Sequence, residues 1–351
     1  MAQSTSEVQV DLDLRSVKAQ TPLQRLFSTT GTWVFVLDIV LVLVFIALSN
    51  GLFASPRAVE SLLLSSTQAL LLALGMAMLL GAGFFDLSLG ANLVLSSVVG
   101  GLTIKAVTGP KLDDGSFANI GLAITLGVVA AVLTGVLFGL VNGILIAYLD
   151  VNSLIATLGT MGIGTGVALL VGGGGDVSGL PRELQKNFGQ ADFLGFVPLP
   201  TLIAIAAAVA LWAMLRFTKF GLVTLAIGSS RSATERAGLK VKRHILALAG
   251  LAGGLAGVAG FIDISRYGST AITGHTSDVL GAITAVVIGG TLLEGGRVSI
   301  VGAVWGTLLA VILQTGLVVI GVASFYQLIA VGVVLIIAVA LDRFRARRRS
   351  R

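Results

Sequence analysis

Long apolar runs separated by short polar segments are the feature that most constrains this chain. A helix of about 20 apolar residues spans the hydrocarbon core of a bilayer, because backbone groups in lipid must be hydrogen-bonded within the protein. The sequence therefore predicts an all-α, polytopic membrane protein with about ten transmembrane helices. The ten runs fall at 32–49, 59–82, 87–107, 119–148, 153–172, 196–215, 244–264, 279–293, 299–320 and 325–341.

Composition excludes most enzyme chemistry. Of the 351 residues 55% are apolar and 11% charged, and 46 Gly favour close approach between helices. The absence of Cys removes disulfides and thiolate sites, and His244 and His275 lie in no metal-ligand spacing. No GxxxxGK[ST] motif is present to bind ATP. The sequence predicts neither catalytic residues nor a metal or other cofactor in this chain.

Positive charge predicts the orientation. With the N-terminus inside, Lys and Arg number three in the N-terminal region, seven from Arg216 to Arg243, one at Arg297 and six after Asp342. These are 17 of the 23 basic residues, and cytoplasmic loops carry such an excess. Both termini are predicted inside, and the net charge of +6 is explained without nucleic acid.

This topology defines the domain organisation. Residues 1–31 contain no apolar run, so we expect a cytoplasmic segment followed by a retained first helix rather than a cleaved signal. A transmembrane domain then covers 32–342, and a basic cytoplasmic tail covers 343–351. Within the domain, 172–196 is the long external loop and 216–243 the long cytoplasmic loop.

A short internal similarity suggests an inverted repeat of helices 2–5 and 7–10. DLSLGANLVLSSVVGG begins at Asp86 and DVLGAITAVVIGG begins at Asp278, and the predicted topology gives them opposite directions. Inverted repeats recur in transporters. The polar segment 265–278 precedes the second copy, and two interpretations stay open: an ordinary surface loop, or broken, re-entrant half-helices.

The cytoplasmic loop contains a predicted short helix. Ser232 and Glu235 have the spacing of a capping box, and Gly238 suits the left-handed residue that ends a helix. A helix of one to two turns is unstable alone, so we expect it to pack on the bundle or on a partner. A plain loop retained for its positive charge is the alternative.

Five ordered blocks carry a family resemblance. FFDLSLGA (84–91), the segment 141–170, TKFGLVTLAIGSSRSATERAGLKVKR (218–243), the segment 282–309 and the segment 316–343 resemble the ribose-type permease family of bacterial ATP-binding cassette importers. The resemblance extends over nearly the whole chain.

The resemblance implies a permease subunit in the bacterial inner membrane. It would pair with a second copy, receive a monosaccharide or related polyhydroxy solute from a periplasmic or lipid-anchored binding protein, and be driven by separate ATPase subunits that hold the ATP and Mg. The family's coupling helix, which docks into the ATPase, falls in the cytoplasmic loop. The Asn usual in that loop is replaced here by Ser229-Ser230. The residues expected to couple to the ATPase are Gly228, Arg231, Ala233, Glu235, Arg236 and Gly238.

Polar residues within apolar segments are candidates for the translocation pathway or its gate, although bonding between helices would use the same groups. They are Asp86, Ser88, Asn92, Asn142, Thr157 and Thr160. Asp86 is also expected to cap the following helix.

The sequence also suggests roles or partners for three further sets of charged residues. Arg182, Glu183 and Lys186 in the external loop are candidates for contact with the binding protein. Asp263 and Arg266 are expected to pair with each other. Asp38, in the first run, should face protein or water. An ion-coupled secondary transporter of small polar solutes is the alternative function, and it would need a coupling site that Asp38 alone does not make.

Overall fold

The computed structural model describes a bundle of long helices. Its described residues are 30–323, apart from 113–116, 194, 196 and 276–277, together with 325–327, 329–330, 332–333 and 336. Eight of the described helices are long and apolar enough to cross a membrane: α2 (Thr30–Leu48), α3 (Pro56–Gly81), α4 (Leu89–Val107), α5 (Ile120–Ala147), α6 (Ser153–Val171), α8 (Leu199–Phe217), α11 (Val241–Tyr267) and α13 (Ile300–Val319). The predicted all-α polytopic membrane fold is confirmed.

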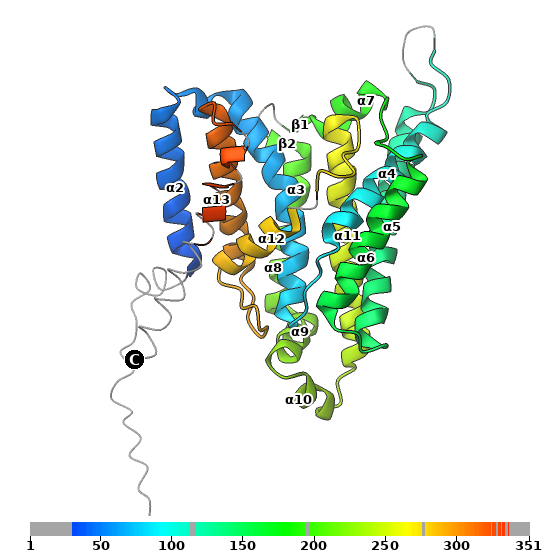
Figure 1. The fold of residues 1–351 in the computed structure, drawn as a ribbon, viewed down its shortest axis with the longest axis vertical. Coiled ribbons are helices and arrows are strands. Elements are labelled where there is room, and N and C mark those ends of the chain that lie inside the picture. Colours follow the sequence, from blue (N-terminus) through cyan, green and yellow to red (C-terminus); the bar gives the residue numbers. More distant parts are fainter. Residues whose placement is uncertain are drawn as a thin grey trace, which may run out of the picture.

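Short elements occupy the two ends of this bundle. One end carries α9 (Lys219–Ser229) and α10 (Arg231–Arg236), and the start of α2 lies at the same end (Figure 1). The other end carries the single turn η2 (Leu52–Ala54), α7 (Arg182–Leu184), the π-helical turn η3 (Gln185–Gly189) and the antiparallel pair β1 (Asp192–Phe193) and β2 (Val197–Pro198) (Figure 1). The cytoplasmic and external loops of the predicted topology therefore lie at opposite ends.

The predicted span at 279–293 is wrong in length. The helix there, α12 (Asp278–Ile288), has 11 residues and reaches only about 16 Å at 1.5 Å per residue. It ends where Gly289 lies against the backbone of Gly302 on α13 and Gly290 takes a left-handed φ of 93°. α12 is thus a half-length helix inside the bundle. The run at 325–341 lies largely outside the described residues, as do the segments 1–29 and 343–351.

Two non-helical segments enter the bundle from opposite ends. Residues 82–88 lead from the α9 end to the start of α4, and 268–275 run from the α7 end toward α12 (Figure 1). They meet beside Gly90, where an added Cβ would lie 2.6 Å from the His275 carbonyl oxygen. Of the two interpretations of 265–278, the structure thus favours a segment that runs into the bundle and precedes a half-helix.

The packing of the two halves is reciprocal. α4 and α5 pack against α11, whereas α12 and α13 pack against α3. α4, which follows the segment 82–88, therefore packs against α11, which precedes the other segment. α12, which follows that other segment, packs against α3, which precedes 82–88. This exchange is the arrangement expected of the inverted repeat suggested by the segments at Asp86 and Asp278.

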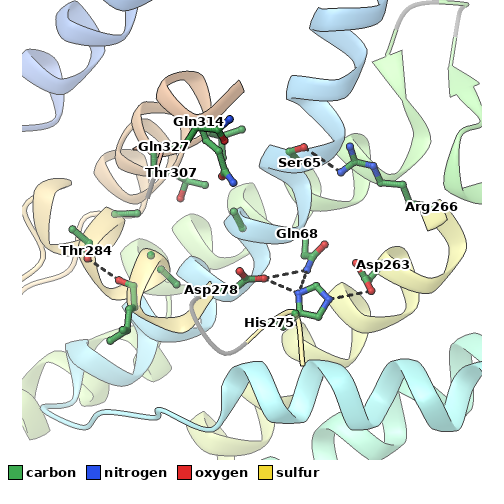
Figure 2. Close-up of a pocket in the computed structure, with 18 of the residues that line it drawn as sticks. Ser65, Gln68, Asp263, Arg266, His275, Asp278, Thr284, Thr307, Gln314 and Gln327 are labelled. Atoms are coloured by element: carbon green, nitrogen blue, oxygen red, sulfur yellow. Dashed lines mark hydrogen bonds and ion pairs between the residues drawn. The ribbon is translucent and has the colours of Figure 1, made fainter. Parts of the chain in front are cut away.

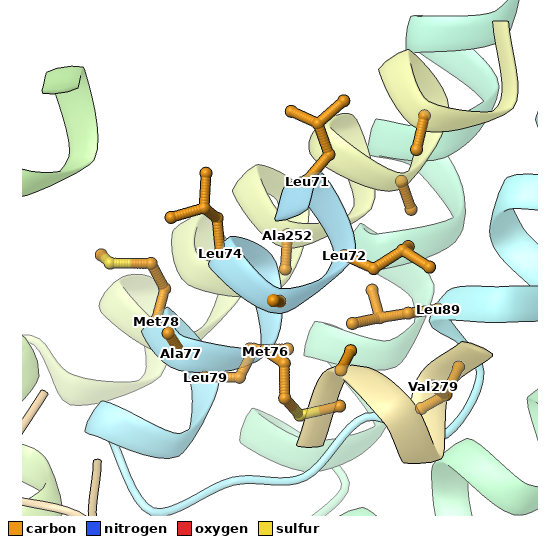
Figure 3. Packing of buried hydrophobic residues seen from close by; sticks show 14 of the residues in the cluster. Leu71, Leu72, Leu74, Met76, Ala77, Met78, Leu79, Leu89, Ala252 and Val279 are labelled. Carbon is orange, nitrogen blue, oxygen red and sulfur yellow. The ribbon is translucent and has the colours of Figure 1, made fainter. Parts of the chain in front are cut away.

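Helix α3 forms the centre of the core. Its residues from 70 to 81 are all buried, and Leu71, Leu72, Leu74 and Met78 project in several directions toward neighbouring helices (Figure 3). A helix that is apolar on every face must be surrounded on every face. α3 meets this condition because α8, α11, α12 and α13 all pack on it.

Candidate functional site

Helix α10 forms a capped turn at the end of the bundle where α2 begins. Its N-cap is Ser230, whose Oγ accepts a hydrogen bond from the Ala233 amide at 3.3 Å. The predicted cap at Ser232 is therefore wrong by two residues, because α9 ends at Ser229 and Ser230 is the extended residue between the two helices. Gly238 has a φ of 80° and follows the helix, as predicted.

Arg231 holds α10 to the turn between α5 and α6. Its Nη2 lies 3.2 Å from Asp150 Oδ1, and its Nε lies 3.1 Å from Glu235 Oε1. Lys242 Nζ approaches Asp150 Oδ2 at 4.0 Å. Thr234, which the sequence analysis did not select, is buried and donates to the Ser230 carbonyl. Arg231 and Thr234 therefore position the helix on the bundle.

The opposite face of α10 is open. Ala233, Glu235, Arg236 and Gly238 are exposed. This face projects from the end of the bundle (Figure 1) and presents a basic residue and an acidic one on a rigid, capped scaffold. Such a surface can be gripped by a partner without any rearrangement of the chain.

Gly228 lies in α9, just before α10, at a junction of three chain segments. A Cβ at this position would lie 2.1 Å from the Gly81 carbonyl oxygen and 2.3 Å from the Gly296 amide nitrogen. The Gly296 amide in turn donates to the Gly81 carbonyl at 3.0 Å. A displacement of α9 must therefore displace the loop after α3 and the loop after α12.

The sequence-predicted residues Asp86, Ser88 and Asn142 form one buried cluster. Asp86 Oδ1 accepts from the Ser88 amide at 2.8 Å and from its hydroxyl at 2.5 Å. Asn142 Nδ2 on α5 donates to Asp86 Oδ2 at 3.2 Å and to Ser88 Oγ at 2.7 Å. The N-cap residue of α4 is Ser88 rather than Asp86. The cluster fixes the entering segment 82–88 against α5.

Asn92, Thr157 and Thr160 are likewise buried, and each donates a hydrogen bond to a backbone carbonyl. Asn92 Nδ2 donates to the Gly135 carbonyl at 3.1 Å. The two threonine hydroxyls donate to carbonyls of their own helix, at 2.7 Å for Thr157 and 3.3 Å for Thr160. The Asn92 bond joins α4 to α5, as polar side chains do between membrane helices, whereas the threonine bonds stay within α6.

Arg182, Glu183 and Lys186 lie at the opposite end of the molecule from α10. Arg182 and Lys186 are exposed and Glu183 is half-buried, whereas Leu184 between them is fully buried. Phe188, in the same segment, packs edge-on against Phe261 of α11 at 5.1 Å between ring centroids. The buried residues anchor the segment so that its charged side chains face outward.

A cavity lined by both apolar and polar side chains lies among α3, α11, α12 and α13 (Figure 2). Its volume is about 660 Å³, within the range of small-molecule sites. None of the six sequence-predicted pathway residues lines it. Its polar lining consists of Ser65, Gln68, Asp263, Arg266, Tyr267, His275, Asp278, Thr284, Thr307, Gln314 and Gln327.

His275 joins three helices at one wall of this cavity (Figure 2). Its Nδ1 lies 2.8 Å from Asp278 Oδ2 on α12 and 3.0 Å from Gln68 Nε2 on α3, and its Nε2 lies 3.3 Å from Asp263 Oδ2 on α11. The predicted pairing of Asp263 with Arg266 is wrong: Arg266 Nη1 instead donates to Ser65 Oγ at 3.2 Å. Asp263 and Arg266 are three residues apart near the end of α11, and their side chains point to different neighbours.

No sequence pattern points to this cavity, because its residues come from four separate segments. One signal was available: one of only two histidines lies three residues before Asp278, in the polar segment that interrupts the apolar pattern. The spacing could place His275 beside Asp278. Nothing in the sequence could bring Asp263 and Gln68 to the same ring.

Asp38 is buried in α2, with 4% of its surface exposed. Within the described residues neither carboxylate oxygen has a hydrogen-bond partner. The side chain lies on the face of α2 that also carries Val34 and Leu41, which pack with Leu309 of α13. Asp38 thus faces protein, as expected, and stands apart from the charged residues of the cavity.

Comparisons with known proteins agree with the multi-pass architecture. A family model described as "Branched-chain amino acid transport system / permease component" matches residues 58–339. Ribose import permease protein RbsC of Bacillus subtilis (strain 168) is 37% identical over 309 residues, covering 88% of this chain and 91% of that protein.

Two further relatives resemble the chain over similar lengths. The galactose/methyl galactoside import permease protein MglC of Escherichia coli (strain K12) is 30% identical over 330 residues, covering 91% of this chain and 95% of that protein. The L-arabinose ABC transporter permease protein AraH of Azospirillum brasilense is 33% identical over 325 residues, covering 91% of both. No solved structure matches the chain significantly.

Proposed function

The chain belongs to the family described as the permease component of branched-chain amino acid transport systems, and from this premise we propose that it is the membrane subunit of an ATP-binding cassette importer for a monosaccharide or related polyhydroxy solute. The relatives named for ribose, galactose and arabinose support the sugar assignment over an amino acid. The chain itself hydrolyses nothing in this proposal.

The observation that carries the proposal is the exposed, capped helix α10. Its outer face is open, whereas Thr234 is buried and Arg231 is bonded to Asp150. An ATPase subunit that grips α10 would move α9 with it. The Gly228 junction would then pass this movement to the loops after α3 and α12, which flank the half-helix and the entering segment 82–88. Two packed arrangements biased by ATP would alternate access to the solute.

The remaining partners follow from the same proposal. Two copies of the chain would form the pathway in the bacterial inner membrane, and lipid would contact the exposed apolar helix faces. A periplasmic or lipid-anchored binding protein would deliver the solute at the α7 end, where Arg182 and Lys186 are exposed. ATP and Mg would be held by the ATPase subunits. We retain Asp86, Ser88, Asn92, Asn142, Thr157 and Thr160 only as residues that shape this pathway.

Reversing the charge of α10 tests the proposal. In the complex with its ATPase, Arg236→Glu should reduce ATPase association and ATP-driven uptake at least tenfold, because an interface discriminates strongly against the wrong charge. Gly238→Pro should do the same, since Pro cannot adopt a φ of 80°. Co-purification and vesicle uptake measure the two effects. Arg57→Glu, an exposed reversal at the opposite end of the bundle, is the matched control. Normal uptake by both α10 variants rejects the proposal.

Replacing Asp38 tests whether the protein is an importer or an ion-coupled carrier. An importer driven by ATP has no need of a titrating group in α2, so Asp38→Asn should keep uptake within about twofold. The uptake should also stay dependent on ATP and insensitive to a protonophore. Collapse of uptake together with loss of its pH dependence would instead favour the carrier.

A further inference from the structure

We propose that the cavity among α3, α11, α12 and α13 is a binding site for a neutral, polyhydroxylated solute, and that Asp263 accepts hydrogen bonds from the solute's hydroxyl groups. The proposal rests on the proposed function and deepens it. It places solute recognition within a single copy of the chain, where Gly274 and His275 of the second entering segment line the cavity.

Asp263 provides the first argument. Its side chain is 1% exposed and lines the cavity. Within the described residues its carboxylate oxygens receive no hydrogen bond, and the 3.3 Å approach of His275 Nε2 is an ion-pair contact only. A carboxylate offers about four acceptor positions, and leaving them empty in a buried site is costly. Hydroxyl groups of a solute in the cavity can supply the missing donors.

The charge balance provides the second argument. The two ring nitrogens of His275 lie 2.8 Å and 3.3 Å from carboxylate oxygens of Asp278 and Asp263. With Arg266, which also lines the cavity, the cluster contains two basic and two acidic side chains. A balanced cluster attracts neither anions nor cations strongly, so an uncharged solute suits it best.

The opposite wall provides the third argument. Gln314, Gln327 and Thr307 lie across the cavity from Asp263 and Arg266 (Figure 2). The intervening surface carries small residues such as Ala282 and Ala310. Polar groups on both sides can hydrogen-bond a solute with hydroxyls all around its ring. A branched aliphatic side chain carries no hydroxyl groups for these polar side chains to bond.

Saturation-transfer NMR on the purified full chain in lipid nanodiscs tests the site, because it detects weak binding. The probes are D-ribose, D-galactose and L-arabinose at millimolar concentration, with L-leucine for comparison. Wild type should transfer saturation to at least one sugar and not to leucine. Asp263→Asn should reduce that signal at least fivefold. Asp192→Asn, which neutralises an exposed carboxylate on β1, should leave it unchanged.

A second variant covers the case in which Asp263→Asn does not fold. Ala310→Leu fills the cavity from α13 without touching the charged cluster, and it should also reduce the sugar signal at least fivefold. Absence of a sugar signal in wild type, or an undiminished signal in the folded cavity variants, overturns the proposal. A leucine signal that Ala310→Leu abolishes also overturns it.

Failure of the site and failure of the proposed function give different results. If only the site is wrong, the Arg236→Glu and Arg57→Glu pair still shows ATPase coupling through α10. If the importer itself is wrong, no ATPase associates with wild type, whatever the sugars do.

Discussion

At the scale of single residues, glycine backbone contacts and buried amides act together. α5 and α11 touch so closely that a Cβ on Gly135 would lie 2.3 Å from the Gly253 carbonyl oxygen. Asn92 of α4 donates to the Gly135 carbonyl at the same crossing. Packing and hydrogen bonding of this kind hold membrane helices together, since lipid is as apolar as their side chains.

This crossing yields a stability prediction. Gly135→Ala should destabilise the purified protein by about 1–3 kcal/mol, the usual cost of overpacking. It should therefore lower the thermal unfolding midpoint. Gly159→Ala on α6, where no atom lies within 4 Å of the added Cβ, is the control and should be neutral or slightly stabilising. Equal midpoints for both variants would show that the crossing is looser than the structure indicates.

Single residues also show which structural features a sequence pattern can predict. Gly238 was predicted because its role depends only on local backbone conformation. The cap of α10 was misplaced because the Ser-x-x-Glu spacing at Ser232 does not reveal where α9 ends. The partners of Asp263 were wrong because they depend on which helices pack together.

At the scale of elements, α10 is a small helix whose stability comes from its cap and its anchor. Ser230 supplies the cap and Arg231 the contact with Asp150. The ion pair is partly exposed and contributes little by itself. The cap and buried Thr234 therefore carry most of the rigidity that a docking element needs.

The cap can be tested by hydrogen exchange. Ser230→Ala should cost the helix about 1 kcal/mol and speed exchange of the α10 amides about fivefold. Ser232→Ala should have a much smaller effect, because that hydroxyl caps no amide in the structure. Mass-spectrometric exchange of the intact protein measures both. A larger effect at Ser232 would restore the cap that the sequence pattern suggested.

The short length of α12 shows what an apolar run leaves open. The run 279–293 contains no charged residue and was counted as a span, although its 15 residues fall short of the roughly 20 that cross a bilayer. The chain ends the helix early because Gly289 packs directly on Gly302, and the rest of the run forms the loop beside Gly228. Hydropathy predicts that a segment lies away from water. The length of its helix depends on the residues against which it packs.

At the scale of the whole molecule, the two ends carry different elements. α10 lies at one end, and α7 with the β1–β2 hairpin lies at the other (Figure 1). The proposed function needs the α10 end to face the cytoplasm, where ATP is available. The positive charges between Arg216 and Arg243 favour that orientation.

The absence of Cys makes the orientation easy to test. Single-cysteine variants Ser232→Cys and Lys186→Cys should label from opposite sides with a membrane-impermeant maleimide. Lys186→Cys should react in intact spheroplasts, and Ser232→Cys only after permeabilisation. Labelling of Ser232→Cys from outside would place α10 beyond the reach of any ATPase and end the importer proposal.

The sequence by itself determined the membrane fold, eight of the long helices and the short inner helix with its Gly238 terminus. These depend on hydropathy, charge and local conformation, all of which are properties of neighbouring residues. Only the tertiary structure decided the half-length of α12, the entry of 82–88 and 268–275 into the bundle, and the meeting of Asp263, His275 and Gln68 in one cavity. Those features arise from contacts between segments up to about 200 residues apart, and no local pattern encodes such contacts.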